Sequence, residues 1–398
     1  MGTIIKELTK VEDAKRLFLN AIDPNTAIAI EMIALIDCPG RVLASSITST
    51  RDVPHYRRAA MDGYAVQSSD TIGASVTNPV MLGVSEDAEQ GTCTRVHTGS
   101  NIPDNADAVV MIEDTTQIGD MVEIRTQVHP NKHVGCVGED MQEGELIFES
   151  GHLLRPCDAA VMASLGLSEI NVYKKPVVAV IPTGDEVVPR TTTQIPPPGK
   201  VLETNGLMAG LYVEKWGGKA RYCDIVPDMP ELIENAIRSN LDADMIILCG
   251  GTSVGERDHV PAVVDSLGEI LVHGVGLSPG KPTALGIIGN VPVVCMPGYP
   301  VAGLVALFAF ARPALRKVGN IPDIPDTIIR ARMGGKINSK EGYLTYARVV
   351  LDGDIAHPLM TSGSGVLSSV AKANGFVIIP ENVEGYEEGQ GVDVVLIE

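Results

Sequence analysis

The sequence predicts a multidomain fold in which a doubly wound parallel α/β domain is joined, on both sides in the chain, to β-rich segments. Its 398 residues exceed what one hydrophobic core supports and suit roughly two to four domains. From Val177 to about Arg316, short apolar runs alternate with helical patterns, as in βαβ units with right-handed crossovers. Outside that region, short β-like runs separated by turns predominate, except near the N-terminus.

The first 50 residues are expected to be mainly helical. A helix is predicted to open at Val11 and run through Leu19, and Ile28–Ile36 continues a similar pattern. A further helix, Cys157–Leu165, and a strand to Tyr173 would return the chain to this first segment.

Residues 51–148 are expected to form a small all-β or α+β domain with three loops of interest. Arg51–Ala65 gathers basic side chains and Asp62 around an Asp-Gly turn, and a plain tight turn explains it as well as a phosphate or metal site. Thr98-Gly99-Ser100 and Gly135–Asp140 add a hydroxyl and paired acids. Loop acids are usually solvated, and they suit Mg²⁺ only where a phosphate supplies further oxygens. The β-like runs are Val80–Val84, Thr94–His97, Ala108–Glu113, Met121–Val128 and Glu145–Phe148.

Buried strands and helices alternate in the central region, and a polar loop follows each strand. Because the carboxyl ends of parallel strands meet at one edge of a sheet, these loops are expected to form one site. The predicted strands are Val177–Ile181, Arg221–Val226, Met245–Cys249 and Val291–Met296. Four helices are predicted in this region. The first is capped by Glu203-Thr204-Asn205-Gly206 and runs through about Trp216, and the others are Pro230–Ser239, about Asp258–Leu267, and Pro300 to about Arg316.

The loop after Met245–Cys249 is the strongest candidate for a site. A strand, a glycine-rich loop and a helix in that order place backbone N–H groups and a positive helix end at one spot, which suits phosphate. An ordinary αβ loop is the alternative, and a glycine pair alone favours it. Asp258, His259 and the lysine of the Ser278–Pro282 turn, all near in sequence, favour a site. The loop residues are Gly250, Gly251, Thr252, Ser253 and Gly255.

Asn320–Pro325 has the composition of a linker, after which the chain is expected to be β-rich to its end. The predicted strands are Thr327–Met333, Leu344–Leu351, Phe376–Ile379 and Val392–Ile397, with a short helix over Ser368–Ala373. The Ser/Gly cluster at 361–365 is of a kind more often flexible than functional, although it also suits an oxyanion.

The formal net charge of −19 and the single Trp argue against nucleic acid and anionic membranes as partners. The longest apolar run, near Val301–Ala311, is too short to span a bilayer, and the N-terminus lacks a signal-peptide core. Seven cysteines without a CxxC pair argue against a disulfide framework and a zinc ribbon. We therefore expect a cytoplasmic protein.

Short motifs follow one another along nearly the whole chain. They are Ala60–Val66, Thr98-Gly99 with Ala106–Val110, Gly138–Asp140, Pro182–Glu186, Gly250–Gly255 with Asp258, Pro279–Pro282, Pro297–Pro300, and Ser362–Ser369 with Ala373–Gly375. Each is weak alone, but the ordered set is highly specific. On these motifs the chain resembles MoeA-type molybdopterin molybdenumtransferases, the molybdenum insertase family that includes the E domain of gephyrin.

The resemblance implies an elongated subunit of four domains. These are an extended helical domain (1–50 and 149–176), an inserted β-rich domain (51–148), a MogA-like doubly wound α/β domain (177–319) and a C-terminal β domain (320–398). It also implies a homodimer whose site lies between the α/β domain of one subunit and the β-rich domain of the other. A MogA/MoaB-type adenylyltransferase is a candidate partner that would supply the substrate.

The resemblance further implies molybdenum cofactor biosynthesis, with adenylylated molybdopterin and molybdate or tungstate as substrates. Mg²⁺-dependent loss of AMP would accompany insertion of the metal, and splitting a phosphoanhydride needs carboxylates, N–H groups and lysine. By matching motifs, the Mg²⁺ and pyrophosphate candidates are Asp62, Thr98, Asp140, Glu186, Asp228 and Asp258. The pterin and nucleotide would lie along Gly250–Gly255, with Pro297 and Pro300 beside them. The expected molybdate pocket consists of Lys281, which we also count as catalytic, Arg348, Ser364 and Ser278.

Three positions depart from the family's pattern. Ser278 stands where the family often has lysine, Gly274 where it sometimes has another, and Tyr299 where it usually has asparagine. Fewer positive charges weaken a pocket's hold on a dianion, so either another cation substitutes or the site differs in affinity or selectivity. Tungstate in place of molybdate is therefore a hypothesis for this chain.

Two other functions stay open beside the insertase. A molybdopterin adenylyltransferase is one, but the large β-rich and C-terminal regions argue against it, because that enzyme is essentially the α/β domain alone. A non-catalytic molybdopterin-binding scaffold is the other. The full set of acidic loop residues argues against a lost site, while the missing lysines at 274 and 278 leave room for one.

Overall fold

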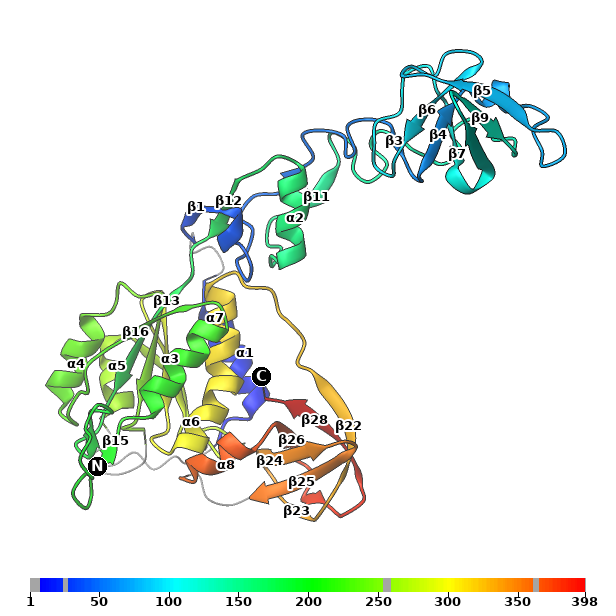
Figure 1. Cartoon of the computed structure of the whole chain (residues 1–398). Coiled ribbons are helices and arrows are strands. Elements are labelled where there is room, and N and C mark those ends of the chain that lie inside the picture. The colour runs from blue at the N-terminus through cyan, green and yellow to red at the C-terminus, as the bar shows by residue number, and fades with distance from the viewer. Residues whose placement is uncertain (1–7, 24–27, 253–258, 361–364, 398) are drawn as a thin grey trace. The chain divides into compact units, whose positions relative to one another are not determined.

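The computed structural model of the chain describes residues 8–23, 28–252, 259–360 and 365–397 (Figure 1). Its contacts divide the chain into two compact units. Unit 1 is made of Met1–Met32, Gly40–Ala44 and Asn171–Glu398, and unit 2 of Ile33–Pro39 and Ser45–Ile170.

The centre of unit 1 is a six-stranded sheet with the order β16-β13-β17-β21-β20-β18. β16, β13, β17 and β21 run parallel, whereas β20 runs antiparallel to β21, and β18 antiparallel to β20. The bounds are β16 Lys219–Tyr222, β13 Val177–Pro182, β17 Met245–Cys249, β21 Val291–Met296, β20 Ala284–Ile288 and β18 Glu269–His273. A two-stranded ribbon, β14 Val187–Val188 with β15 Val201–Leu202, extends from the end of β13.

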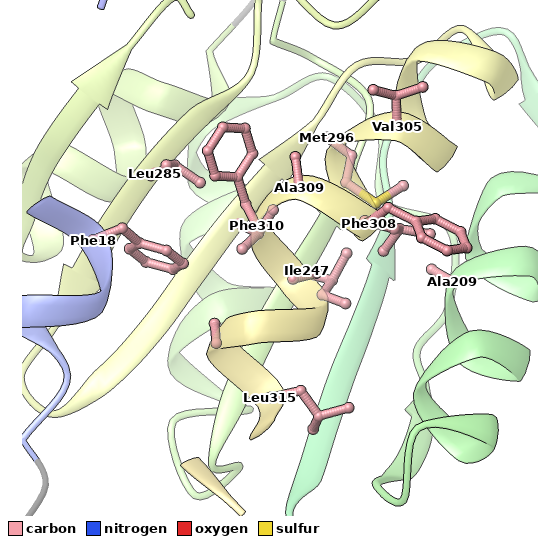
Figure 2. Packing of buried hydrophobic residues seen from close by; sticks show 14 of the residues in the cluster. Phe18, Ala209, Ile247, Leu285, Met296, Val305, Phe308, Ala309, Phe310 and Leu315 are labelled. Atoms are coloured by element: carbon pink, nitrogen blue, oxygen red, sulfur yellow. The ribbon is translucent and has the colours of Figure 1, made fainter. Parts of the chain in front are cut away.

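Helices cover both faces of this sheet because successive residues of each strand point to opposite sides. Ile247 of β17 belongs to the cluster with α1, α3 and α6–α7, and its neighbour Ile246 to the cluster with α4 and α5. Figure 2 shows Phe18 of α1, Phe310 and Ile247 in the first cluster. The bounds are α1 Val11–Ala21, α3 Asn205–Lys215, α4 Pro230–Arg238, α5 Val260–Leu267, α6 Pro300–Ala306, the π-helical η4 Leu307–Ala311, and α7 Arg312–Val318.

The C-terminal part of unit 1 forms a second six-stranded sheet, β19-β24-β25-β22-β28-β26, with β24 also paired to β26. One of its faces joins the α/β core through Phe376, whose ring packs edge-on against Phe308 at 5.9 Å. The bounds are β19 Leu277–Ser278, β22 Ile328–Met333, β24 Leu344–Asp352, β25 Ile355–Met360, α8 Leu367–Lys372, β26 Gly375–Ile379 and β28 Gly391–Leu396. A short ladder pairs β23 Ile337–Asn338 with β27 Gly385–Tyr386.

Unit 2 contains a six-stranded sheet of order β7-β4-β6-β5-β9-β8 and a helical end with α2. Its core is lined by Tyr64, Leu82 and Ile124, all almost fully buried. The sheet bounds are β4 Gly63–Val66, β5 Val80–Val84, β6 Thr92–Val96, β7 Ala108–Met111, β8 Thr115–Ile118 and β9 Met121–Ile124. The remaining elements are β2 Ile47–Thr48, β3 Arg58–Ala59, β10 Val134–Gly135, β11 Leu146–Phe148, α2 Pro156–Ser164, and the 3₁₀ turns η1 Leu35–Asp37, η2 Ser68–Thr71 and η3 Ile112–Asp114.

The start of α2 is held by a buried carboxylate. Asp158, at the third helical position, accepts hydrogen bonds from the Arg155 backbone N–H (2.8 Å) and guanidinium and lies 2.8 Å from His152 Nε2. Burial alone would raise the pKa of Asp158, but these hydrogen bonds hold it well below its usual range. The helix therefore begins on a charge that is retained at neutral pH.

Most predicted elements of the central and C-terminal regions are confirmed, and Met245–Cys249 and Val291–Met296 have the predicted bounds. The helix predicted over Ile28–Ile36 is wrong: the segment forms strand β1, Ile30–Ala34, which pairs with β12, Glu169–Tyr173. The parallel sheet is confirmed for four strands, and β20 and β18 add an antiparallel edge that we did not predict from the sequence.

Candidate functional site

Three loops lie side by side at the carboxyl edge of the parallel strands of unit 1. Pro182, the last residue of β13, is level with Cys249 of β17, which is level with Met296 of β21. The residues that follow these strands therefore start from adjacent positions on one edge, as expected for an open α/β sheet.

Glycine allows the first two loops to touch. A Cβ on Gly250 would lie 2.6 Å from the carbonyl oxygen of Thr183, and the φ of Gly250 is +120°, where L side chains are strained. The N–H of Gly250 donates to the Met296 carbonyl at 3.1 Å, so it holds the loop rather than standing free. Across the edge, Asn205 Nδ2 at the start of α3 donates to the carbonyl of Gly298 at 2.7 Å.

The glycine-rich loop continues along the side of α5. A Cβ on Gly251, whose φ is +61°, would lie 2.7 Å from Val260 Cγ2, so only glycine fits between loop and helix. Thr252 is buried. The imidazole of His273, the last residue of β18, forms a hydrogen bond with the backbone of Thr252, and burial lowers the pKa of this imidazole. Ser253, Gly255 and Asp258 lie outside the described residues.

Two acidic residues, one in the loop after β13 and one in the loop after β16, are joined by a pair of backbone-to-carboxylate hydrogen bonds. The N–H of Asp228 donates to Asp185 Oδ1 at 3.2 Å, and the N–H of Asp185 donates to Asp228 Oδ2 at 3.3 Å. Lys200 donates to the carbonyl of Asp185. Glu186 is exposed, and its Oε2 lies over Gly184. The pair brings two acids 43 residues apart to one point on the sheet edge.

The candidates for the oxyanion pocket lie at the second sheet of unit 1. Ser278 in β19 is level with Thr345 of β24, three residues before Arg348. Arg348 is buried, with 3% exposure, and burial lowers its pKa from the usual range. Lys281 is exposed in the turn that follows Ser278, and its backbone carbonyl accepts from Val275 at 2.9 Å. Ser364 lies outside the described residues.

The loop after β21 reaches towards this second sheet. Pro297 is buried, and Pro300 is the first residue of α6, where the lack of an N–H costs nothing. A Cβ on Gly365 would lie 3.5 Å from Cδ1 of Tyr299, so the Tyr299 ring faces the end of the Ser/Gly cluster. The first sheet's edge and the C-terminal β region thus meet within unit 1.

In unit 2, Asp62 and Thr98 form a direct pair. Asp62 Oδ1 accepts from the backbone N–H of Thr98 at 2.7 Å and from its hydroxyl at 2.8 Å. These bonds, the backbone bond first, lower the pKa of the Asp62 carboxyl. His97 Nδ1 lies 3.8 Å from the other oxygen. Both residues are exposed, and the Asp62 carboxyl stays ionised above its lowered pKa.

Asp140 lies in a separate exposed loop of unit 2. Its N–H donates to the carbonyl of Val53 at 3.0 Å, and Met141 forms a bridge with Val53. The loop therefore pairs with the segment that leads to Asp62. Unit 2 thus holds Asp62, Thr98 and Asp140, whereas unit 1 holds Glu186, Asp228 and the glycine-rich loop.

Sequence reasoning did not single out Asp185, Thr183 or Asn205 as site residues. Asp185 and Thr183 both lie in the Pro182–Glu186 motif, and their place at the end of a strand was the available signal. Thr183 Oγ1 and Asn205 Oδ1 are buried and have no hydrogen-bond partner among the residues that the structure describes. No pattern in the sequence indicates that, since it depends on how the loops pack.

Among the residues that the structure describes, no three His, Cys, Asp or Glu side chains gather as a metal-binding cluster. Over the same part of the chain, no helix is long and apolar enough to cross a membrane.

Unit 1 therefore contains a doubly wound α/β domain with a glycine-rich loop and an acid pair at the carboxyl edge of its parallel strands, the edge where open α/β sheets bind ligands. Family models agree with this class. Residues 9–166 match the MoeA N-terminal region (domain I and II), residues 179–317 a probable molybdopterin binding domain, and residues 330–397 the MoeA C-terminal region (domain IV).

Relatives that match nearly the whole chain have names that agree with these family models. A protein of Methanocaldococcus jannaschii named putative molybdopterin biosynthesis protein is 35% identical, over 99% of each chain. Molybdopterin molybdenumtransferase 2 of Mycobacterium tuberculosis is 33% identical over 91% of this chain and 94% of its own. A crystal structure of the molybdopterin biosynthesis moeA protein of Pyrococcus horikoshii OT3 superposes with a TM-score of 0.85 at 29% identity, covering 98% of this chain and 100% of that one. The chain belongs to the MoeA family of molybdopterin molybdenumtransferases, enzymes of molybdenum cofactor biosynthesis.

Proposed function

We propose that this protein inserts molybdate or tungstate into adenylylated molybdopterin and releases AMP in a Mg²⁺-dependent reaction. The observation that carries the proposal is the Asp185–Asp228 pair, fixed at the sheet edge beside the glycine-rich loop. Two carboxylates beside a loop of this kind can hold a divalent cation, and that cation can in turn bind the oxygens of an anionic pyrophosphate.

The donor set fits Mg²⁺. This ion prefers oxygen ligands and is commonly held by one or two carboxylates plus substrate phosphates and water. Asp185 and Asp228, with Glu186 nearby, would hold it from unit 1. When bound, Mg²⁺ supplies charge neutralisation on the phosphate oxygens.

The chain's own residues then act on the two ends of the substrate. The Gly250–Gly251 loop lets the backbone approach the pyrophosphate closely, since side chains are excluded there. Arg348 and Lys281 supply cationic charge for the oxyanion, and Ser278 supplies a hydroxyl in place of a lysine amine. The hydroxyl carries no charge, so we expect weaker oxyanion binding than a lysine would give.

We further propose that two chains pair, so that Asp62, Thr98 and Asp140 of one subunit complete the site of the other. Support comes from the family resemblance and from the division of the candidate acids between two units. We place the reaction in the cytoplasm, with a MogA/MoaB-type adenylyltransferase as the source of the adenylylated substrate.

The test is AMP release from adenylylated molybdopterin with Mg²⁺, adding molybdate and tungstate in separate reactions. We expect release that depends on Mg²⁺ and on one or both oxyanions. Asp228→Asn keeps the hydrogen bond from Asp185 but removes a charge, and we expect at least a tenfold loss of rate, on the order of one lost charged contact. Glu231→Gln, an exposed acid in the first turn of α4, is the control.

Equal rates for Asp228→Asn and Glu231→Gln would overturn the metal assignment. Binding of the adenylylated pterin without any AMP release would favour the scaffold, and ATP consumption with molybdopterin would favour the adenylyltransferase.

A further inference from the structure

A short segment near the start of the chain pairs with the backbone of unit 1 far along the sequence. We name residues 8–10 the N-terminal strap. Thr9 forms a parallel bridge with Val275. Its N–H donates to the Gly274 carbonyl at 3.1 Å, and its carbonyl accepts from the Gly276 N–H at 2.8 Å. The strap therefore binds the whole segment between β18 and β19.

Helix α1 anchors the strap, because it begins at Val11, directly after it. The Lys10 carbonyl accepts from the Ala14 N–H at 2.9 Å, which ties the strap to the first turn of the helix. Val11 and Phe18 of α1 lie in the same buried cluster as Val275. The position of the strap is therefore fixed by the core of unit 1.

The segment that the strap binds leads directly into the turn that carries two candidate oxyanion donors, Ser278 and Lys281. The backbone folds back on itself, so that the N–H of Val275 donates to the Lys281 carbonyl at 2.9 Å. The carbonyl of Gly276 accepts from the N–H of Leu344, at the start of β24, at 2.8 Å. Gly276 therefore joins the strap, the turn and the second sheet at one point.

This segment has little conformational preference of its own. It reads Gly-Val-Gly, and glycine loses more conformational freedom on folding than any other residue. Gly274 has a φ of +91°, and a Cβ on Gly276 would lie 3.0 Å from the Gly342 carbonyl oxygen, so a stiffer residue at either position would be strained or crowded. The direction of the turn therefore depends on hydrogen bonds from other segments, including the two from the strap.

The side chain at 278 makes that direction important. A lysine carries its charge on a flexible four-carbon stem, which adapts to small shifts of the backbone. A serine hydroxyl is attached directly to Cβ, so it moves with the backbone, and a binding group must be held within about 0.5 Å of its productive position. Ser278 is therefore a donor whose position is set by the segments that hold its backbone.

We propose that Thr9 is a positioning residue for oxyanion binding. It acts through Gly274 and Gly276, whose backbone it fixes so that Ser278 and Lys281 face the oxyanion in one orientation. This inference rests on the proposed function, and it adds that the start of the chain sets the affinity of the oxyanion pocket.

The test measures how AMP release depends on the concentration of molybdate, and separately of tungstate, in the full chain and its variants. Thr9→Pro removes the N–H that donates to Gly274 and leaves the Thr9 carbonyl in place. We expect it to raise the KM for the oxyanion roughly tenfold, on the order of one lost hydrogen bond. The KM for adenylylated molybdopterin should not change, because we assign that substrate to the Gly250–Gly251 loop, which the two bonds from the strap do not involve.

Lys10→Pro is the matched control. Proline fits the Lys10 φ of −59°, and the Lys10 N–H is not one of the two groups that bond the turn. Thr9→Ala is a second control, since it keeps both backbone groups and removes only the side chain. Both variants should have the KM values of the parent.

Thr9→Gly covers the case in which proline at this position disturbs folding. It keeps both hydrogen-bonding groups but gives the strap more conformational freedom, so we expect a rise of roughly threefold in the KM for the oxyanion. Equal KM values for the oxyanion in the parent, Thr9→Pro and Thr9→Gly would overturn the inference. An equal rise in the KM for both substrates would also overturn it, because it would report a general loosening of unit 1.

Calorimetric titration with molybdate or tungstate separates this inference from the proposed function. A parent chain that binds an oxyanion but releases no AMP would contradict the proposed function alone. In that case the variants are compared by their Kd for the oxyanion. Weaker binding by Thr9→Pro than by Lys10→Pro would support the inference, and equal binding would overturn it. A parent chain that binds neither oxyanion would overturn both proposals.

Discussion

Replacing Gly250 by alanine should destabilise unit 1 and displace the glycine-rich loop at the carboxyl edge of its sheet. The new Cβ would lie 2.6 Å from the Thr183 carbonyl oxygen and 3.1 Å from Thr183 Oγ1, and the φ of +120° is unfavourable for any L side chain. Holding alanine at that φ costs about 1–3 kcal/mol. Displacing the neighbouring loop costs about 1–3 kcal/mol more. The expected loss is therefore about 2–6 kcal/mol in the free energy of unfolding.

Trp216 gives a direct assay for this prediction. It is the single Trp of the chain, and it is buried in unit 1, 5.3 Å from the Phe308 ring by centroids. Its fluorescence during urea titration therefore reports unfolding of unit 1. We expect Gly250→Ala to unfold at clearly lower urea than the parent. Under the proposed function, its AMP release should also fall, because the Gly250–Gly251 loop has moved.

Gly298→Ala is the matched control on the same edge. A Cβ there would meet nothing closer than the Gly250 Cα at 3.8 Å, which is ordinary van der Waals contact, and its φ is not positive. We expect its free energy of unfolding to stay within about 0.5 kcal/mol of the parent's, as for a surface change without steric conflict. If the two alanine variants unfolded at the same urea concentration, the close packing of the glycine loop would not be what glycine provides.

Three further outcomes follow from the structure. Asp158→Asn should destabilise unit 2 by about 2 kcal/mol at neutral pH, through loss of the charged cap of α2. Because the pKa of Asp158 is depressed by folding, this contribution is present above its unfolded pKa and fades as pH falls below about 4, which hydrogen exchange of parent and variant across pH would follow. Thr98→Val removes one of the bonds that lower the pKa of Asp62, so that carboxyl should titrate at higher pH in carbon NMR; an unchanged titration would show the hydroxyl to be irrelevant. Iodoacetamide should label the exposed Cys157 in the native protein and spare Cys295, whose thiol pKa burial raises to about 12; labelling of Cys295 before unfolding would contradict its burial.

The central fold could be predicted because its signals are local. Met245–Cys249 is wholly apolar, five residues long and followed by glycines, so a strand buried on both faces was the natural interpretation. Ile28–Ile36 carries no such signal: its residues suit a helix face and a strand equally. Its strand β1 depends on pairing with β12, more than 130 residues later, and local pattern does not report that partner. β20 is a different case: its antiparallel direction comes from a hairpin with β21 across Gly289-Asn290, a local turn signal that was available in the sequence.

The sequence could predict that the candidate site lies at the carboxyl edge of the sheet, but not which residues contact one another there. Asp228 was predicted from the family resemblance, and it lies near the Pro182–Glu186 loop because β13 and β16 are neighbours and their following loops share an edge. The sequence could not say that Asp185, rather than Glu186, exchanges hydrogen bonds with Asp228, since both acids follow the same strand. The strand order nevertheless gives the edge a direction, from β16 at one end of the sheet to β18, which the Ser278 turn follows, at the other.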